Sequence, residues 1–162
     1  MKLNELMEKY GDYEVKEGFM DFLEKPKPKT VLDLKDGDRY CYITADGELR
    51  FVSWQNDESD KNKLYIGNIF LTEEDAEFEV ERLKVIAELK KYAKEFSDEE
   101  WSNPTIPKYV IYLSSQDYRM DITSHYSVRY PFLYFESKEK AQEAIDAVGE
   151  ERIKKYYFGV RE

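Results

Sequence analysis

The chain has 162 residues, of which 41% are hydrophobic, 15% aromatic and 37% charged, and its mean hydropathy is -0.77. This length suits one domain or two small ones with a sizeable core. The hydrophobic and aromatic content excludes a disordered tail. No apolar run approaches the roughly 18 residues of a membrane span, and the residues after Met1 are not typical of a signal peptide. We therefore expect a soluble, cytoplasmic protein.

The charge of the chain limits its partners. The formal net charge is -10, from 35 Asp and Glu against 25 Lys and Arg. Between residues 57 and 82 there are nine acidic side chains and three basic ones. This excess repels nucleic acid and anionic membranes and favours basic surfaces. We expect a basic protein as partner, with no direct nucleic acid or membrane binding.

Residues 1–36 are expected to form a separate N-terminal arm. Asn4 to Tyr10 can form two helical turns ended by Gly11, and Val15 to Leu23 can form a second short helix. Pro26 and Pro28 then favour an extended linker, because proline cannot continue a helix.

Residues 37–97 are expected to form a first βββα unit. The side-chain pattern alternates from Arg39 to Thr44 and from Leu49 to Trp54, with a turn at Gly47, which predicts a β-hairpin. The polar tract after it is expected to be a loop, followed by a third strand and a capped helix; the expected ranges are Gln55 to Lys61, about Leu64 to Leu71, and Thr72 to about Phe96.

Residues 98–162 are expected to repeat this unit. Phe70 to Val80 aligns without a gap on Phe135 to Ile145, and Lys108 to Ser114 and Tyr118 to Thr123 fall near the positions of the first hairpin. The predicted fold is therefore α+β: tandem βββα repeats forming antiparallel sheet with helices packed on one side, preceded by a short helical arm. The remaining expected features are a capping box at Ser97 to Glu100, a C-cap at Gly149 and a last short helix from Glu150 to Phe158.

Catalytic, metal and phosphate motifs are missing from the sequence. The one histidine, His125, is expected in a loop, and the one cysteine, Cys41, as a small buried residue in a strand. There is no Cys-x-x-Cys, His-x-x-x-His or calcium-loop spacing, and no glycine-rich turn joins a strand to a helix. We expect no enzyme activity, no cofactor and no metal.

The candidate partner-binding residues are carboxylates on the predicted helix after Thr72 and on the loop before it. Residues one helical turn apart share a helix face, which suits either a solvated acidic face or a docking surface for a basic partner. The candidates are Asp57, Glu58, Asp60, Glu73, Glu74, Glu77 and Glu81.

Tyrosine is unusually frequent, with 14 in the chain and many in the second unit. These residues are typical of half-buried sheet positions, or of a face that binds a protein or a planar ligand. A nucleotide site there needs basic residues nearby; the candidate ligand-binding residues are Arg119, Tyr126, Arg129 and Tyr130.

The predicted long helix has two apolar stripes. One contains Leu83, Ile86 and Ala93, and the other contains Val85, Leu89, Tyr92 and Phe96. One sheet cannot cover both stripes. We therefore expect the surplus apolar surface to meet another part of the chain or a second copy, giving a homodimer.

Six segments carry a resemblance to a known group of proteins: Tyr40–Ile43, Gly67–Phe70, Thr72–Glu77, Leu83–Lys90, Lys140–Ile145 and Gly149–Val160. In these the chain resembles small, uncharacterised acidic proteins encoded by phages, prophages and mobile elements of Gram-positive bacteria. The group has no established activity, so no residue role transfers. The resemblance implies the cytoplasm of a bacterial host and an anti-defence setting, which includes anti-CRISPR proteins and nucleotide sponges.

Two functional hypotheses follow from these features. The first is a phage accessory protein that inhibits a host defence factor, such as a nucleic-acid-binding protein, through its acidic surface. The second is a sponge that sequesters a signalling nucleotide, with a structural or interaction protein of the phage as a further alternative.

Overall fold

The computed structural model describes residues 3–11, 30–126, 129 and 131–160. It is a mixed α+β structure with two small antiparallel sheets of two strands each. Helix α1 spans Leu3–Tyr10, where two helical turns are predicted. The predicted second helix and the proline linker lie outside the described residues. No helix in the described ranges is long and apolar enough to cross a membrane.

The first lobe contains strands β1 (Arg39–Ile43) and β2 (Leu49–Ser53) and helix α2 (Glu58–Tyr65). The strands pair antiparallel with Cys41 opposite Phe51, which confirms the predicted hairpin. Its small core consists of Tyr40, Trp54 and Ile69. Each of these side chains is less than 9% exposed.

The predicted loop and third strand of this lobe are wrong. Asp57 accepts a hydrogen bond from the Asp60 N–H at 2.8 Å and caps α2, so the polar tract begins a helix. Gly67, with φ 74°, then turns the chain, and the side chain of Asn68 donates to and accepts from the backbone of Ile43 in place of a strand. Only Phe70 pairs with the hairpin, through reciprocal backbone bonds to Cys41.

The second lobe contains α4 (Asp98–Ser102), β3 (Lys108–Leu113), β4 (Met120–His125), α5 (Lys138–Val148), α6 (Glu150–Arg152) and a π-helical segment (Ile153–Tyr157). It confirms the second hairpin, the Ser97 capping box and the last short helix. Phe135 pairs with β3 at Tyr109 alone, so the third strand is again reduced to a single bridge.

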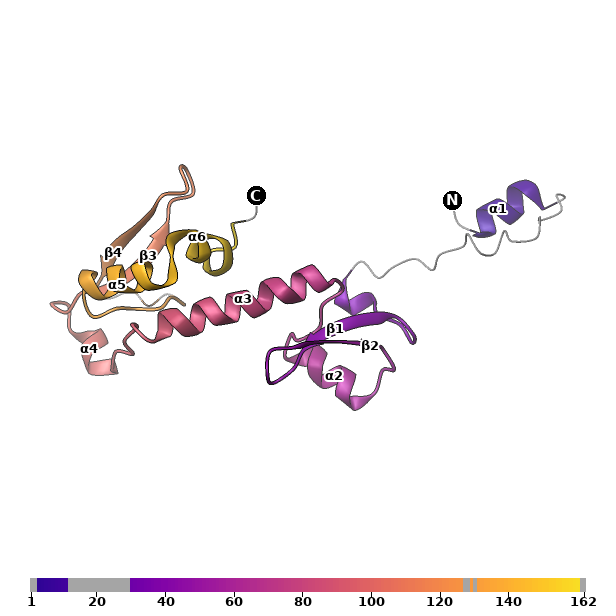
Figure 1. The fold of residues 1–162 in the computed structure, drawn as a ribbon, viewed down its shortest axis with the longest axis horizontal. Helices are drawn as coiled ribbons and strands as arrows, with labels where there is room; N and C mark the ends of the chain where they lie inside the picture. Colours follow the sequence, from indigo (N-terminus) through magenta and orange to yellow (C-terminus); the bar gives the residue numbers. More distant parts are fainter. Residues whose placement is uncertain (1–2, 12–29, 127–128, 130, 161–162) are drawn as a thin grey trace.

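Helix α3 (Glu73–Lys90) belongs to both lobes. It contacts β1 and β2 on one side and α5 and the π-helical segment on the other, and Figure 1 shows it running from the first lobe to the second. Ala76, near the start of α3, is 0% exposed, whereas Val85 and Leu89 belong to the larger core of the second lobe.

Helix α3 ends earlier than the predicted Phe96. After its last residue, Lys90, the N–H of Lys94 donates to the carbonyl oxygen of Tyr134 at 2.7 Å, so the chain leaves the helix to join the second lobe. Of the two predicted apolar stripes, the one with Val85 is buried, whereas Leu83 remains 48% exposed. Self-association through this exposed stripe stays a prediction.

We predict that Gly149→Ala lowers the free energy of unfolding by about 1–3 kcal/mol, because Gly149 has φ 93° and ψ 130°, which L-residues rarely adopt. A Cβ here meets nothing within 4 Å, so the cost comes from backbone torsion alone. Thermal unfolding should show a melting temperature lower by about 2–4 °C per kcal/mol. Ala147→Ser, at an exposed position of α5, is the control, and equal melting temperatures of the two variants would contradict the prediction.

Candidate functional site

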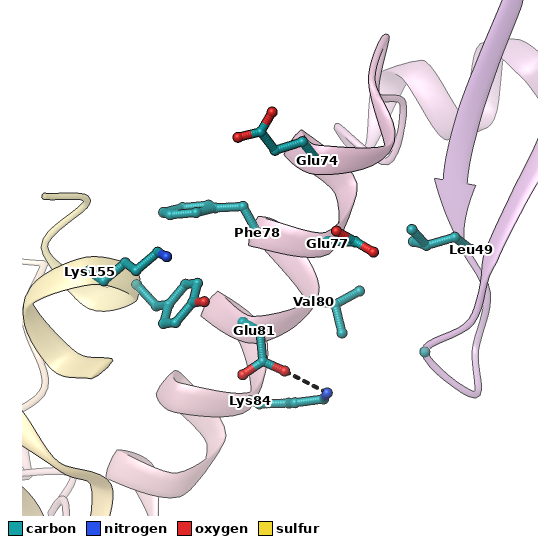
Figure 2. A pocket seen from close by; sticks show the side chains of 10 residues that line it. Leu49, Glu74, Glu77, Phe78, Val80, Glu81, Lys84 and Lys155 are labelled. Atoms are coloured by element: carbon teal, nitrogen blue, oxygen red, sulfur yellow. Dashed lines mark hydrogen bonds and ion pairs between the residues drawn. The ribbon is translucent and has the colours of Figure 1, made fainter. Parts of the chain in front are cut away.

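A groove of about 500 Å³ lies across the middle of α3, between the β1–β2 hairpin and the π-helical segment. Leu49 of β2 forms one side and Tyr156 of the π-helical segment the other. Between them α3 contributes Glu74, Glu77 and Phe78, among others. Figure 2 shows Glu77 directed toward Leu49 and Phe78 directed toward the π-helical segment. The groove therefore combines three carboxylates and two lysines, Lys84 and Lys155, with apolar and aromatic side chains.

The start of α3 fixes the position of these carboxylates. The Thr72 hydroxyl accepts a hydrogen bond from the Asp75 N–H at 3.2 Å and caps the helix, as predicted. Glu74 and Phe78 are four residues apart and Glu74 and Glu77 three apart, so they are neighbours on the helix surface. Ala76 is fully buried, and its small side chain lets α3 lie close to the hairpin.

The carboxylates of the groove differ in how far they are neutralised. Glu81 pairs with Lys84 at 2.7 Å and with Arg152 at 3.6 Å, and the hydrogen bond from Lys84 lowers the pKa of its carboxyl. Within the described part of the chain, neither Glu74 nor Glu77 forms an ion pair. Glu74 lies in the first turn of α3, where the helix dipole favours a carboxylate, whereas the neighbouring like charge of Glu77 destabilises the helix slightly.

Two aromatic side chains, Phe78 of α3 and Tyr156 of the π-helical segment, form the second wall of the groove. We call this pair of rings the aromatic step. The ring centroids of Phe78 and Tyr156 are 5.2 Å apart, with the ring planes tilted by 48°. Tyr156 is held in place because the neighbouring Ile153 is fully buried and Arg152 binds Glu88 of α3 at 3.1 Å. This wall could not be predicted from the sequence, because its two rings are far apart along the chain.

The structure separates the other predicted acidic residues from the groove. Asp57 caps α2 and Glu58 is exposed in its first turn. Asp60 is only 4% exposed, and its carboxylate accepts hydrogen bonds from the Tyr40 hydroxyl at 2.5 Å and the Gln55 N–H at 2.7 Å. The prediction of Asp60 as a partner-binding residue is wrong, because this carboxylate joins α2 to β1 inside the first lobe.

The predicted ligand-binding residues of the second lobe do not meet. Arg119 lies in the β3–β4 turn, and Tyr126 follows the other end of β4, roughly 20 Å away along a six-residue strand. Arg129 is beyond Tyr126, where its guanidinium pairs with Asp98 at 2.6 Å and lies 5.0 Å from the Trp101 ring centroid. Tyr130 lies outside the described residues. Arg119 and Arg129 therefore do not form one anion site.

The remaining reactive side chains have structural positions. Cys41 is 1% exposed, which confirms its predicted burial, and this burial raises the pKa of its thiol. His125 is the last residue of β4, opposite Lys108, and not in a loop as predicted. In the ranges that the structure describes, no group of three or more His, Cys, Asp or Glu side chains could hold a metal ion.

Comparison with known proteins adds no family assignment. No protein-family model, curated protein or solved structure matches the chain. The groove across α3 is therefore the candidate site, with the unpaired carboxylates of Glu74 and Glu77 and the aromatic step as its main features.

We predict that Tyr40→Phe costs about 1–3 kcal/mol of unfolding free energy at neutral pH, because buried Asp60 loses a donor. Burial alone raises the pKa of Asp60, but the hydrogen bonds from Tyr40 and Gln55 outweigh it and lower that pKa below the ordinary value. The stability due to this lowering is present above the unfolded pKa of about 3.9 and is lost as the pH falls through the folded value. The cost of the variant should therefore shrink toward acid pH.

Urea unfolding at neutral and acid pH measures this cost. Tyr65→Phe is the control, because Tyr65 is 90% exposed and its hydroxyl faces solvent. A loss of stability in Tyr40→Phe that does not change with pH would contradict the assigned role of Asp60.

Proposed function

We propose that the chain is a protein-binding module whose groove across α3 takes a positively charged segment of a partner protein. The observation that carries the proposal is the pair Glu74 and Glu77, which have no cationic partner among the described residues and border an aromatic wall. A basic segment would supply the missing charges. Its aliphatic parts would cover the apolar floor formed by Leu49 and Val80.

The net charge favours a protein as this partner. At -10 the chain repels nucleic acid, and carboxylates spaced along a helix present negative charge much as phosphates do. A protein surface that binds nucleic acid is basic and therefore complementary to this groove. In the setting that the resemblance implies, the partner is a host defence factor, and binding would block its nucleic-acid surface.

Exposed charge around the groove contributes mainly to the rate of encounter. Glu73, in the first turn of α3, adds negative charge near the groove without lining it. Exposed charges attract an opposite surface over about one Debye length, roughly 8 Å at physiological salt. Together with the exposed carboxylates of Glu74 and Glu77 they raise the association rate, while the apolar and aromatic contacts of the groove determine how long the complex lasts.

We also propose that the two lobes descend from a tandem duplication of one unit made of a hairpin, a single bridging residue and a helix. In support, Phe70 and Phe135 each make reciprocal backbone bonds to the first strand of their hairpin, and a hydroxyl cap two residues later starts a helix. Ala76 and Ala141 are both fully buried. Superposing the two hairpins should place the first turns of α3 and α5 at equivalent positions. Helices that leave their hairpins in different directions would contradict the duplication.

We predict that the double variant Glu74→Gln, Glu77→Gln loses partner binding while keeping its fold. Glutamine keeps the size and helix propensity of glutamate, so only charge changes. Against a partner captured from a bacterial host lysate, the association rate constant should fall about three- to tenfold at low ionic strength, with a weaker salt dependence. Biolayer interferometry at low and high salt measures both.

The matched control is Glu99→Gln, Glu136→Gln, which removes the same charge from exposed positions of the second lobe. Capture of a protein counts as support only if the groove variant loses it and the control retains it. A partner held equally by both variants would overturn the proposed role of the groove.

A further inference from the structure

Strand β2 (Leu49–Ser53) leaves one edge of the first sheet unpaired. The N–H of Thr44 donates to the carbonyl oxygen of Glu48 at 2.8 Å just beyond the paired strands, and this pair fixes the alternation along the hairpin. Residues 50 and 52 of β2 therefore bond to β1, and the residues between them point their N–H and C=O groups outward. Within the described residues, these outward groups have no hydrogen-bond partner; they belong to Leu49, Phe51 and Ser53.

Phe51, the middle residue of β2, is the apolar centre of this edge. Its side chain lies on the same sheet face as that of Cys41, which is opposite it in the register. The start of α3 covers this face at Cys41, whose thiol donates to the carbonyl oxygen of Thr72 at 3.3 Å. Cys41 is 1% exposed, whereas Phe51 remains 47% exposed. The edge therefore offers backbone hydrogen-bonding groups and an uncovered aromatic side chain together.

The outer edge of the second sheet is blocked by its own strand. Tyr109 of β3 exchanges backbone bonds with Phe135 on the side away from β4. Its partner Ser124 and, by alternation, Ile122 therefore point their backbone groups outward from β4. The outward N–H of Ile122 already donates to the carboxylate of Asp121 at 2.8 Å, and a charged side chain at an edge opposes strand pairing. Of these two outer edges, only that of β2 is open at its centre.

We infer that two copies of the chain pair through this edge, with their β2 strands antiparallel and the two Phe51 residues at the two-fold axis. Phe51 then exchanges both backbone bonds with Phe51 of the second copy, and Leu49 does the same with Ser53 of the second copy. The two hairpins form one continuous antiparallel sheet, and the two Phe51 side chains cover each other. This inference goes beyond the proposed function, which needs only one copy of the groove.

Two features of the edge favour a second copy as its occupant. Phe51 is the middle residue of the strand and points its backbone groups outward, so in the symmetric antiparallel register every outward residue of β2 meets another one. The hairpin is also locally neutral, because Arg39 and Arg50 balance Asp46 and Glu48. The net charge of -10 is therefore not concentrated at this edge, where two copies would otherwise repel each other.

Sedimentation equilibrium of the full chain tests the inference. We expect a monomer of 19.4 kDa at low concentration and a dimer of twice that mass at high micromolar concentration, because one strand pair buries little area. Phe51→Lys should raise the dissociation constant of the dimer at least about tenfold, because a charge at the edge opposes pairing. Circular dichroism checks that the variant is folded.

The matched control is Leu83→Lys, which adds the same charge at a leucine of α3 that is 48% exposed. It should leave the dissociation constant unchanged. A chain that stays monomeric at all concentrations would overturn the inference. A dimer that is lost in Leu83→Lys and kept in Phe51→Lys would also overturn it, and would assign self-association to the exposed stripe of α3.

Cysteine cross-linking tests the register. In the proposed pairing the two Cα atoms of residue 51 are about 5.5 Å apart, which a disulfide can span. The two Cα atoms of residue 53 are roughly 13 Å apart, because each lies four residues from the other's partner. Phe51→Cys should therefore form a disulfide-linked dimer under mild oxidation, and Ser53→Cys should not, while the buried Cys41 stays unreactive. Equal cross-linking of the two variants would overturn the proposed pairing.

Discussion

Everything in the structure depends on one helix that two small lobes share. An isolated two-stranded hairpin is marginally stable in water and needs a helix to cover its apolar face. Helix α3 does this for the first hairpin, whereas α5 covers the second hairpin. In the second lobe α3 packs against α5 and the π-helical segment, where Val85 and Leu89 join the core. Because its ends are occupied, its middle is left partly uncovered between the lobes. The groove is thus a consequence of the architecture.

The charges along α3 follow the same division. Toward the second lobe, acidic side chains are paired, as Glu81 with Lys84 and Glu88 with Arg152. Near the start of α3, the positive end of the helix dipole favours the carboxylate of Glu74. This carboxylate has no cationic partner within the described residues. Within the groove itself, Glu81 is thus neutralised by Lys84, whereas Glu74 and Glu77 keep their charge.

The sequence predicted those elements whose signals are local. Alternating side chains identified both hairpins, and Thr72 and Ser137 identified both helix starts, because these signals need only a few neighbouring residues. Helix α2 was missed because its polar composition resembles a loop, although Asp57 three residues before Asp60 is a capping pattern. The third strand of the first lobe was predicted wrongly, because the Asn68 amide bonds to the Ile43 backbone in its place, and this tertiary contact has no local signal.

The site was predicted only in part, because only some of its features have a local signal in the sequence. Helical spacing brought Glu74 and Glu77 together correctly, but nothing local distinguishes the exposed Glu58 from the buried Asp60, whose place depends on Tyr40. The aromatic step joins residues from α3 and the C-terminal end of the chain. The charge and the aromatic wall contribute differently to specificity. A net charge of -10 attracts any basic protein over about 8 Å, whereas the aromatic wall acts only on a group in contact with it. Selection among basic partners must therefore come from the contact that only the fold creates.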